Sequence, residues 1–555
     1  MRWVGRMRWT VLPLMVLAVA LRLVHLDADP VADFIPKDEG YQVDEGYKTL
    51  SPRNLVLFGA THWSEFDNYG GWMQDSPVTQ WAYYASFSEF GTNRVSARSV
   101  TVVFFALFIL GAAAFFQSRY ATGVTLMGIV LLACDQALFH FSRVTNFEIP
   151  LIAFVYGGIF IAARCTRDHA YLALLALVFV AGVAAFGIKM SALIYLVPAI
   201  VALSAAEVLR GSRVSVKPQA YLVMALGVLA IAAILLFWPD WVSRVDWHRP
   251  FQEPDRLLPH QMSQLSPLAL SLASLALIDI GLRHGVAAFR DNRYLLLVAS
   301  TAFIAPVMLA FATYNPPRYY VVVVPALLLI VVEWLHLWRA GALKDPYHFS
   351  MGRLFFAGII SLLLAVSVVD FGSEYLIPSL AFIPQGDYPG LGTATKMILY
   401  PVVLVGFWVF VWSLWRHRIR ARILSFALVA GIALHLGFSA RSIAEAVLHS
   451  SYAGSEITRK LELIVAEGES VAGDWAPFLA LDTRIPALYT TDGVNDSGQI
   501  ELVRPTYFLD SHTFSDRKMM EALQKRPGEK HEPIHLGTLF GLPVDLVKID
   551  YPSEH

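Results

Sequence analysis

The sequence predicts an all-α polytopic membrane bundle of about 13 transmembrane helices, followed by a small α/β domain. Of the 555 residues, 56% are hydrophobic and only 16% are charged, and the mean hydropathy is +0.53. A soluble globular protein carries roughly 25% charged residues. In addition, apolar runs close to the roughly 20 residues needed to cross a bilayer recur along most of the chain.

The apolar runs begin at the N-terminus and end near residue 439. Met1 to Leu26 has a basic start and an apolar centre, but Arg22 interrupts it and no small-residue cleavage site follows. We therefore expect a retained first span rather than a signal peptide that is removed. The predicted spans are residues 10–26, 99–117, 120–139, 149–164, 170–187, 191–208, 219–238, 266–282, 294–313, 319–338, 354–371, 397–415 and 423–439.

Basic residues mark every second connection between these spans. Such connections are typical of the cytoplasmic side, so we expect a cytoplasmic N-terminus and an extracytoplasmic C-terminus. We expect the membrane to be a prokaryotic plasma (inner) membrane. The basic connections contain Arg119, Arg164, Arg167, Arg210, Arg213, Lys217, Arg283, Arg290, Arg293, Arg339, Lys344, Arg353, Arg416, Arg418, Arg420 and Arg422.

Three polar stretches are too long for simple turns, and all three fall on the predicted outer side: residues 27–98, 239–265 and 372–396. Long loops gathered on one face indicate a site at that face rather than a pathway through the bundle. This arrangement favours an enzyme over a transporter.

Residues 440–555 differ sharply in composition, with many charged residues, glycines and prolines and no further span. A helix is expected near 456–467, and strands near 470–473, 506–509 and 544–549. The chain thus divides into a transmembrane domain, 1–439, and a small extracytoplasmic domain, 440–555.

Charge and cysteine content exclude two classes of function. The net charge of −1 gives no basic surface for nucleic acid, and the basic clusters already have a topological explanation. The only cysteines, Cys134 and Cys165, fall in or at the inner end of predicted spans. Neither a disulfide framework nor a thiolate metal site is indicated.

An acidic pair, Asp44-Glu45, follows the first span within the segment Val43-Asp44-Glu45-Gly46-Tyr47. A similar pair, Asp38-Glu39, precedes it after Pro36. We favour the second pair because Asp44 can begin a helix that would hold its carboxylate in place. The structural alternative is that Asp44 serves only as a helix N-cap and Glu45 only as a solvated carboxylate of the first turn.

An ordered set of motifs resembles the GT-C superfamily of integral membrane glycosyltransferases. Within it, the chain is most similar to the branch of protein O-mannosyltransferases and lipid A aminoarabinose transferases. The motifs are Asp44-Glu45-Gly46-Tyr47, Asp75-Ser76-Pro77, Asn93-Arg94-Val95-Ser96-Ala97-Arg98, Ser142-Arg143, Glu148-Ile149-Pro150-Leu151 and Pro317-Arg318-Tyr319.

The resemblance implies inverting transfer of a sugar from a polyprenyl-phosphate donor to a hydroxyl-bearing glycan, lipid or protein acceptor at the outer face. Asp44 would be the base that activates the acceptor, and Glu45 would support it. Asp75 would help to organise the site, in some family members through a divalent metal ion. Here Ser76 stands where a basic residue often follows, and Asp75 could equally cap the next helix.

Cations at the outer ends of spans are the candidates for binding the donor phosphate. Arg318 with Tyr319 is preferred because a guanidinium offers planar multidentate donors, and the alternative is an arginine that reaches only to lipid headgroups. Arg98 and Lys189 are secondary candidates. Glu148 is an ionised group at a span entrance that needs a partner, for which Arg143 is the nearest cation in sequence.

A metal ligand set is not apparent in the sequence. His62, His248 and His260 fall in outer loops but lack a metal-binding spacing, and scattered loop histidines are usually only solvated. A divalent metal ion is therefore left open as a cofactor. We keep two further alternatives: a transporter or flippase of lipid-linked sugars, and a C-terminal domain that carries the activity while the spans serve as an anchor.

Overall fold

The computed structural model describes twelve stretches of the chain. They are residues 9–31, 40–165, 170–211, 260–285, 287–312, 316–344, 347, 350–377, 393–416, 422–491, 494–524 and 532–551. The predicted span 219–238, the acidic pair Asp38-Glu39 and most of the loops 239–265 and 372–396 lie outside the described residues.

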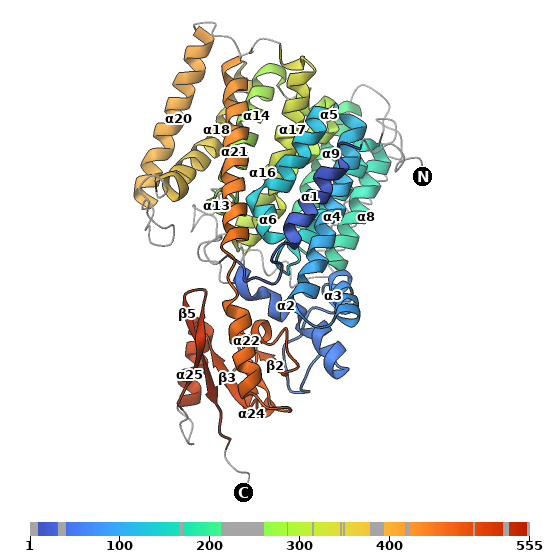
Figure 1. The fold of residues 1–555 in the computed structure, drawn as a ribbon. Helices are drawn as coiled ribbons and strands as arrows, with labels where there is room; N and C mark the ends of the chain where they lie inside the picture. Colours follow the sequence, from blue (N-terminus) through green and yellow to red (C-terminus); the bar gives the residue numbers. More distant parts are fainter. Residues whose placement is uncertain are drawn as a thin grey trace.

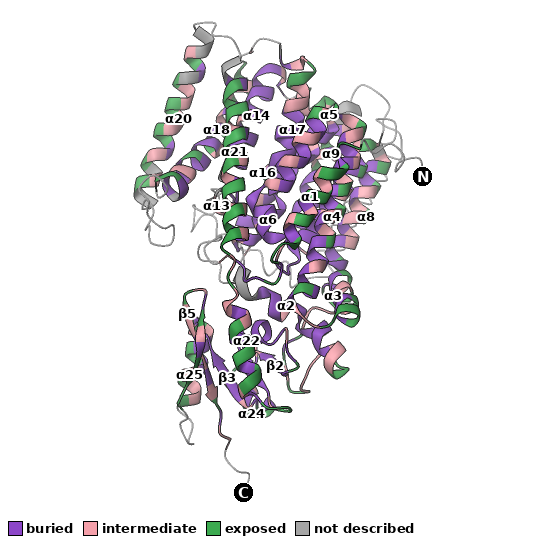
Figure 2. Cartoon of the chain, in the orientation of Figure 1, coloured by how far each residue is buried: buried purple, intermediate pink, exposed green. Residues whose placement is uncertain are grey.

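The apolar part of the chain forms a bundle of helices that run roughly side by side (Figure 1). Their buried faces pack into one continuous hydrophobic core, and exposed residues lie along the outer faces (Figure 2). The helices are α1 (Leu12–Leu23), α4 (Arg94–Arg119), α5 (Thr122–Cys134), α6 (Gln136–Phe141), α7 (Glu148–Arg164), α8 (Ala170–Gly187), α9 (Ala192–Gly211), α13 (His260–Leu265), α14 (Pro267–His284), α15 (Ala287–Asp291), α16 (Arg293–Ala310), η4 (Pro317–Val322), α17 (Val324–Arg339), η5 (Ala342–Lys344), α18 (Met351–Phe371), η6 (Gly372–Leu376), α20 (Thr393–Arg416) and α21 (Arg422–Leu448).

Each predicted span other than 219–238 coincides with described helix. Among the described residues, five helical stretches have the length and composition to cross a membrane: Arg94–Arg119, Arg293–Ala310, Pro317–Arg339, Met351–Phe371 and Leu424–Ile464. Five further apolar helices are shorter. The count of thirteen spans therefore stays a prediction.

The third predicted span is not one continuous helix. It is divided between α5 and α6 at Asp135, whose side chain accepts the Leu138 N–H and so caps the start of α6. The carboxylate also accepts the Ser266 hydroxyl at 2.8 Å. An aspartate offers the backbone a local acceptor that competes with continued helix, and this explains the break.

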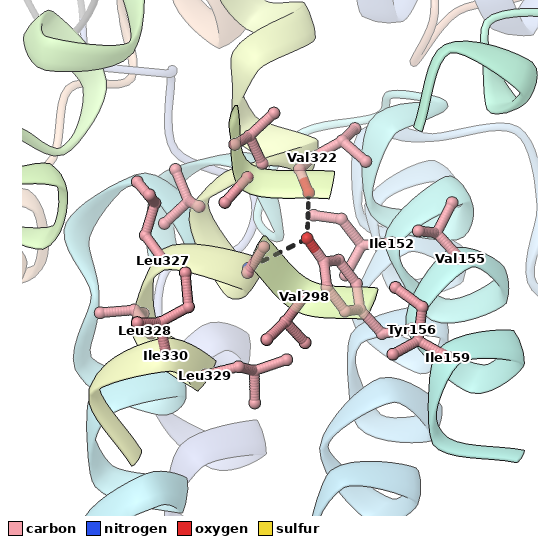
Figure 3. Close-up of a cluster of buried hydrophobic side chains, with 14 of the residues drawn as sticks. Ile152, Val155, Tyr156, Ile159, Val298, Val322, Leu327, Leu328, Leu329 and Ile330 are labelled. Carbon is pink, nitrogen blue, oxygen red and sulfur yellow. Dashed lines mark hydrogen bonds between the residues drawn. The ribbon is translucent and has the colours of Figure 1, made fainter. Parts of the chain in front are cut away.

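A side chain from α7 stabilises the junction between η4 and α17. The Tyr156 hydroxyl donates to the Val322 carbonyl at 2.7 Å and accepts the Ala326 N–H at 3.0 Å (Figure 3). These two backbone groups would pair with each other in a continuous α-helix. The hydroxyl is thus inserted into the helical ladder, in surroundings that are otherwise apolar.

Two helices of the first long loop, α2 (Gly40–Phe58) and α3 (Pro77–Phe90), lie at one end of the bundle, between it and the C-terminal domain (Figure 1). Pro52 inside α2 has no N–H to give to the Lys48 carbonyl. The Gln80 side chain of α3 donates to that carbonyl instead, at 2.8 Å. Residues 44–54 of α2 are buried except for Tyr47, although the helix is polar in composition.

The described C-terminal residues form a five-stranded mixed sheet with order β2-β1-β3-β5-β4. β1 is parallel to both β2 and β3, whereas β3–β5 and β5–β4 are antiparallel. The elements are α22 (Ala453–Ile464), β1 (Val471–Gly473), α23 (Ala476–Leu479), β2 (Ala487–Tyr489), α24 (Ser497–Val503), β3 (Tyr507–Asp510), α25 (Phe514–Gln524), β4 (Ile534–Leu539) and β5 (Leu542–Lys548). Because α21 runs through residue 440, the proposed boundary falls inside a helix and stays a prediction.

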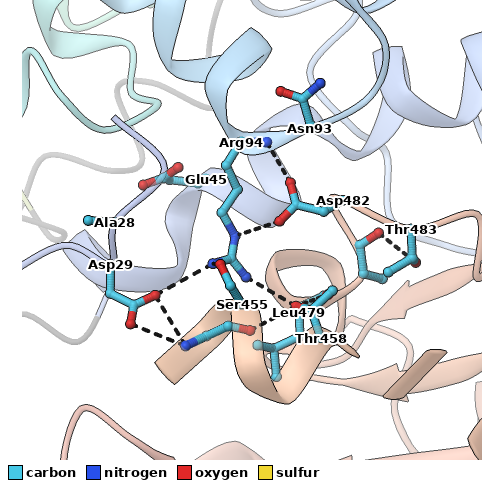
Figure 4. A network of polar contacts seen from close by, with 12 residues as sticks. Ala28, Asp29, Glu45, Asn93, Arg94, Ser455, Thr458, Leu479, Asp482 and Thr483 are labelled. Carbon is cyan, nitrogen blue, oxygen red and sulfur yellow. Dashed lines mark hydrogen bonds and ion pairs between the residues drawn. The ribbon is translucent and has the colours of Figure 1, made fainter. Parts of the chain in front are cut away.

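Two buried arginines join this sheet domain to the bundle. Arg94, at the start of α4, contacts Asp29 and Asp482 and donates to Ser455 and Thr458 of α22 (Figure 4). Arg53 of α2 donates to three carbonyl groups of the C-terminal domain, those of Ala480, Thr483 and Ile485. Burying a guanidinium is costly unless its donors are used, so these contacts hold the two parts together.

Candidate active site

Five charged side chains from separate parts of the chain meet at the end of the bundle beside α2. Asp44 and Lys48 belong to α2, Glu148 begins α7, Lys189 follows α8, and Arg318 lies in η4. Lys48 Nζ is 2.6 Å from Asp44 Oδ2, and Arg318 Nε is 3.2 Å from the same oxygen. The two cations therefore share one carboxylate.

Glu148 extends this cluster. Lys189 Nζ is 2.7 Å from its Oε1, and Lys48 Nζ is 3.9 Å from its Oε2. Lys48 thus lies between the two carboxylates. With three cations and two carboxylates, the cluster has an excess of one positive charge, and all its members are buried except Lys189, which is partly buried. Such a site suits an anionic group that arrives from outside.

Asp44 is held ionised by its neighbours. Burial by itself would raise the pKa of the carboxyl, but the charges of Arg318 and Lys48 outweigh it, and the pKa lies below its ordinary value. The Tyr47 hydroxyl also donates to Asp44 Oδ1, at 2.5 Å. Burial and the adjacent carboxylate raise the pKa of Tyr47, which keeps its proton on the phenol as a donor.

Glu45 points toward a different partner. Its carboxylate accepts from Arg98 Nε at 2.8 and 3.1 Å, and Thr145 Oγ1 lies 3.5 Å from Oε2. The pair is fully buried. Glu45 therefore binds the start of α4 to α2, next to Asp44 but outside the cluster of five charges.

The C-terminal domain supplies an aromatic ring to the site. Tyr489, at the end of β2, stacks on Tyr47, and Tyr69 contacts both rings edge to face. The Tyr69 hydroxyl donates to the Tyr47 carbonyl at 2.9 Å. The residue that hydrogen-bonds to Asp44 is thus packed between two other tyrosines.

The structural alternative for Asp44 is wrong in one respect: α2 begins at Gly40, so Asp44 lies inside the helix rather than at its N-cap. Asp75 also does not cap α3. The N-cap position is Ser76, whose side chain makes no capping bond and donates instead to the Ile188 carbonyl. Asp75 is exposed and contacts none of the cluster residues described here.

The pairing of Arg143 with Glu148, suggested by sequence, is also wrong. Arg143 donates to the carbonyls of Val24 and His25, whereas Glu148 pairs with Lys189. The cation nearest to Glu148 in sequence is not its partner, because Lys189, after the end of α8, lies beside the start of α7.

The phosphate candidates fall into two groups. Arg318 and Lys189 belong to the cluster, and the Tyr319 ring lies beneath the Lys189 ammonium, 4.0 Å from its centroid. The Tyr319 carbonyl accepts from Tyr195 at 2.7 Å, which helps to position η4. Arg98 is committed to Glu45 instead. The roles assigned to all these residues stay predictions.

Lys48 and Tyr489 were missed by the sequence analysis. Lys48 could have been found, because on a helix it lies four residues after Asp44, the spacing of an ion pair. No local signal points to Tyr489, which meets Tyr47 only through the folding of the C-terminal domain onto α2.

Within the described part of the chain, no group of three or more His, Cys, Asp or Glu side chains is arranged to hold a metal ion. His62 bonds to the Tyr69 carbonyl through Nε2, and His248 lies outside the described residues. The carboxylates of the site are each paired with a cation. These residues do not fit a divalent ion, so we assign no step to one.

Comparisons with known proteins give a family match over part of the chain and two solved structures of similar fold. Residues 74–238 match the model of the family described as dolichyl-phosphate-mannose-protein mannosyltransferase. No curated protein matches the sequence. Two crystal structures of ArnT from Cupriavidus metallidurans are similar over 97% of both chains, one in the apo state with TM-score 0.54 and 14% identity, the other bound to undecaprenyl phosphate with TM-score 0.52 and 13% identity. The resemblance to GT-C membrane glycosyltransferases is thereby confirmed, and at this identity the structural likeness concerns the fold.

Proposed function

We propose that this chain, an integral membrane protein with the GT-C fold, transfers a sugar from a polyprenyl-phosphate donor to a hydroxyl-bearing acceptor, with inversion at the anomeric carbon. The observation that carries the proposal is the contact between Asp44 and Arg318, whose Nε and Oδ2 atoms lie 3.2 Å apart. It brings a carboxylate suited to accept a proton next to a guanidinium suited to bind phosphate. ArnT from Cupriavidus metallidurans, which has a similar fold, has been solved bound to undecaprenyl phosphate, and this supports a donor of this class.

In the proposed reaction, the acceptor oxygen attacks the anomeric carbon while its proton passes to Asp44. The bond between that carbon and the phosphate oxygen breaks, and the polyprenyl phosphate leaves with the bonding electrons. Arg318, Lys48 and Lys189 stabilise the negative charge of the leaving phosphate. The excess positive charge of the cluster supports this assignment.

Donor binding would also adjust the basicity of Asp44. Burial would raise the pKa of the Asp44 carboxyl, but Arg318 and Lys48 lower it below its ordinary value, which weakens the carboxylate as a base. A donor phosphate that draws the Arg318 charge toward itself would raise that pKa. Asp44 would therefore become a better base when the donor is bound. In the absence of donor, it would take fewer protons from the acceptor unproductively.

The location of the site supports a reaction at the outer face. α2, α3 and the C-terminal domain lie at the same end of the bundle (Figure 1), and we infer that this end is extracytoplasmic, in a prokaryotic plasma membrane. The acceptor is a glycan, lipid or protein. Turnover measured after chelation tests whether the reaction requires a divalent metal ion.

The test is an Asp44→Asn variant of the full chain, reconstituted with undecaprenyl-phosphate sugars and a lipid and glycan extract as acceptor. Release of undecaprenyl phosphate is measured by mass spectrometry. We expect a loss of about 10²- to 10⁴-fold, the range for removing a general base. Glu89→Gln, an exposed carboxylate of α3, is the matched control and should keep full turnover.

Two results would contradict the proposal. Retained turnover in Asp44→Asn would exclude this residue as the base. Movement of the intact lipid-linked sugar across the membrane, without bond cleavage, would favour the transporter alternative instead.

A further inference from the structure

A group of polar contacts links the first long loop to the C-terminal domain. It consists of Asp67 and Asn68, from the connection between α2 and α3, and Asn495, which lies just before α24. We call these three residues the Asn495 clasp. None of them belongs to the cluster of five charges around Asp44.

Asn68 and Asn495 bond to each other in both directions. The Asn68 backbone N–H donates to Asn495 Oδ1 at 2.9 Å, and the Asn495 backbone N–H donates to Asn68 Oδ1 at 2.7 Å. Asn495 Nδ2 also donates to Asp67 Oδ1 at 2.7 Å and to the Tyr489 carbonyl at 2.8 Å. The Asn495 side chain is fully buried, and both ends of its amide are used.

Asparagine suits this position for two reasons. The φ angle of Asn495 is +49°, in the left-handed region that glycine and asparagine adopt most easily. Its amide supplies an acceptor oxygen and two donor hydrogens, and all of them have partners here. Glycine would fit the backbone but make none of the side-chain contacts, whereas aspartate would keep the acceptor and lose both donors.

The clasp fixes the backbone that carries two tyrosines. One is Tyr489, whose carbonyl accepts from Asn495. The other is Tyr69, whose N–H donates to Asp67 Oδ1 at 2.9 Å, the same oxygen that accepts from Asn495. The main-chain positions of both tyrosines therefore depend on one side chain.

These two tyrosines pack around Tyr47 of α2. The Tyr489 ring stacks on the Tyr47 ring, the Tyr69 ring contacts it edge to face, and the Tyr69 hydroxyl donates to the Tyr47 carbonyl. Tyr47 in turn donates to Asp44. A continuous chain of contacts thus leads from Asn495 to the proposed base.

We propose that Asn495 is a positioning residue for the sugar transfer, and that it acts through Tyr489 and Tyr69. By fixing their backbone, it keeps both rings against Tyr47, so that the Tyr47 hydroxyl stays directed at Asp44. This role rests on the proposed function of Asp44. The cations assigned to the donor phosphate are not part of the clasp, so its loss should lower the turnover number and leave the donor KM unchanged.

The experiment compares Asn495→Gly and Asn495→Asp with the parent protein in the reconstituted transfer assay. Glycine adopts the left-handed backbone without strain, so the first variant removes only the side-chain contacts. The second keeps the acceptor but releases the Tyr489 carbonyl. Both should lower the turnover number about three- to tenfold, as expected for displacing an aromatic partner of Tyr47.

Leu546→Ala is the matched control for a general loss of stability. Leu546 is a fully buried core residue of β5, and β1 and β3 separate β5 from β2, the strand of Tyr489. The substitution weakens the same domain but leaves the clasp intact. It should keep full turnover at temperatures below its melting temperature.

A double-variant cycle tests whether Asn495 acts through Tyr489. Asn495→Gly combined with Tyr489→Ala should lose clearly less turnover than the product of the two single losses, because the ring that Asn495 positions is already absent. Independent structural effects would multiply instead. Hydrogen exchange, which needs no turnover, should be faster for the Asn68 amide in Asn495→Gly than in the parent protein or Leu546→Ala.

Three results would overturn the proposal: full turnover in either Asn495 variant, single losses that multiply in the double variant, or unchanged exchange of the Asn68 amide in Asn495→Gly. Failure of the proposed function appears elsewhere, as retained turnover in Asp44→Asn. The exchange measurement is independent of that result, so the two failures are distinguishable.

Discussion

Tyr489 of the C-terminal domain stacks on Tyr47 of α2, with ring centroids 4.8 Å apart and an interplanar angle of 26°. Tyr47 in turn donates its hydroxyl proton to Asp44. A residue far along the chain therefore supports the geometry of the proposed base. The C-terminal domain completes the site rather than merely covering it.

We expect Tyr489→Ala to lower the turnover number about three- to tenfold, since an aromatic pair of this kind contributes about 0.5–1.5 kcal/mol. Tyr489→Phe keeps the ring and should retain most of the activity. Turnover and donor KM are measured for both variants. A larger effect on KM than on turnover would indicate that Tyr489 acts on donor binding and not through Tyr47.

Gly46 separates the two acidic residues from Tyr47 and lies against the C-terminal domain. A Cβ atom at this position would collide with the backbone of Phe478. Backbone atoms cannot move aside as a flexible side chain can. Gly46→Ala should therefore lower the melting temperature and remove most of the activity. Gly70→Ala, where a Cβ meets nothing within 4 Å, is the control and should behave like the parent protein.

Lys48→Met should raise the pKa of Asp44. The carboxyl has a pKa below its ordinary value in the folded protein, partly through the Lys48 charge, and removing that charge favours the protonated form. The acid limb of the profile of kcat/KM against pH should therefore move to higher pH. Lys48→Arg keeps the charge and should leave the limb near its original position, and an unshifted limb in Lys48→Met would contradict the assignment.

Tyr156→Phe removes the hydroxyl that joins η4 to α17. The Val322 carbonyl and the Ala326 N–H then each lose the hydrogen bond that this hydroxyl makes. We expect a loss of about 1–3 kcal/mol of stability for these buried groups, seen as a lower melting temperature. Since η4 carries Arg318, the donor KM should also rise. Tyr84→Phe, on the partly exposed α3, is the control for loss of a hydroxyl alone.

The sequence analysis recovered features that depend on local pattern. The apolar runs located the described helices of the bundle, and the motifs located Asp44, Glu148 and Arg318, which do come together. It failed where contacts depend on distant chain segments. The partner of Glu148 is Lys189 and not Arg143, which is nearer in sequence. The break at Asp135 has a different cause, because it depends on a local capping bond inside an apolar run.

The polar helix α2 shows the same limit. Its composition suggests an exposed surface helix, yet residues 44–54 are buried apart from Tyr47. The burial is possible because Lys48 and Arg318 pair with the Asp44 carboxylate and Arg98 pairs with the Glu45 carboxylate. No single segment of the sequence contains all of these partners, so the pattern could not be recognised from α2 alone.

Four consecutive residues of α2 contact four different parts of the molecule: Asp44 meets η4, Glu45 meets α4, Gly46 meets α23 and Tyr47 meets β2. Successive helical residues point about 100° apart, so these contacts surround the helix axis. Rotation or sliding of α2 would break contacts on every side at once. The helix has lost its rigid-body degrees of freedom, and any opening that admits an acceptor must come from side chains or from the C-terminal domain.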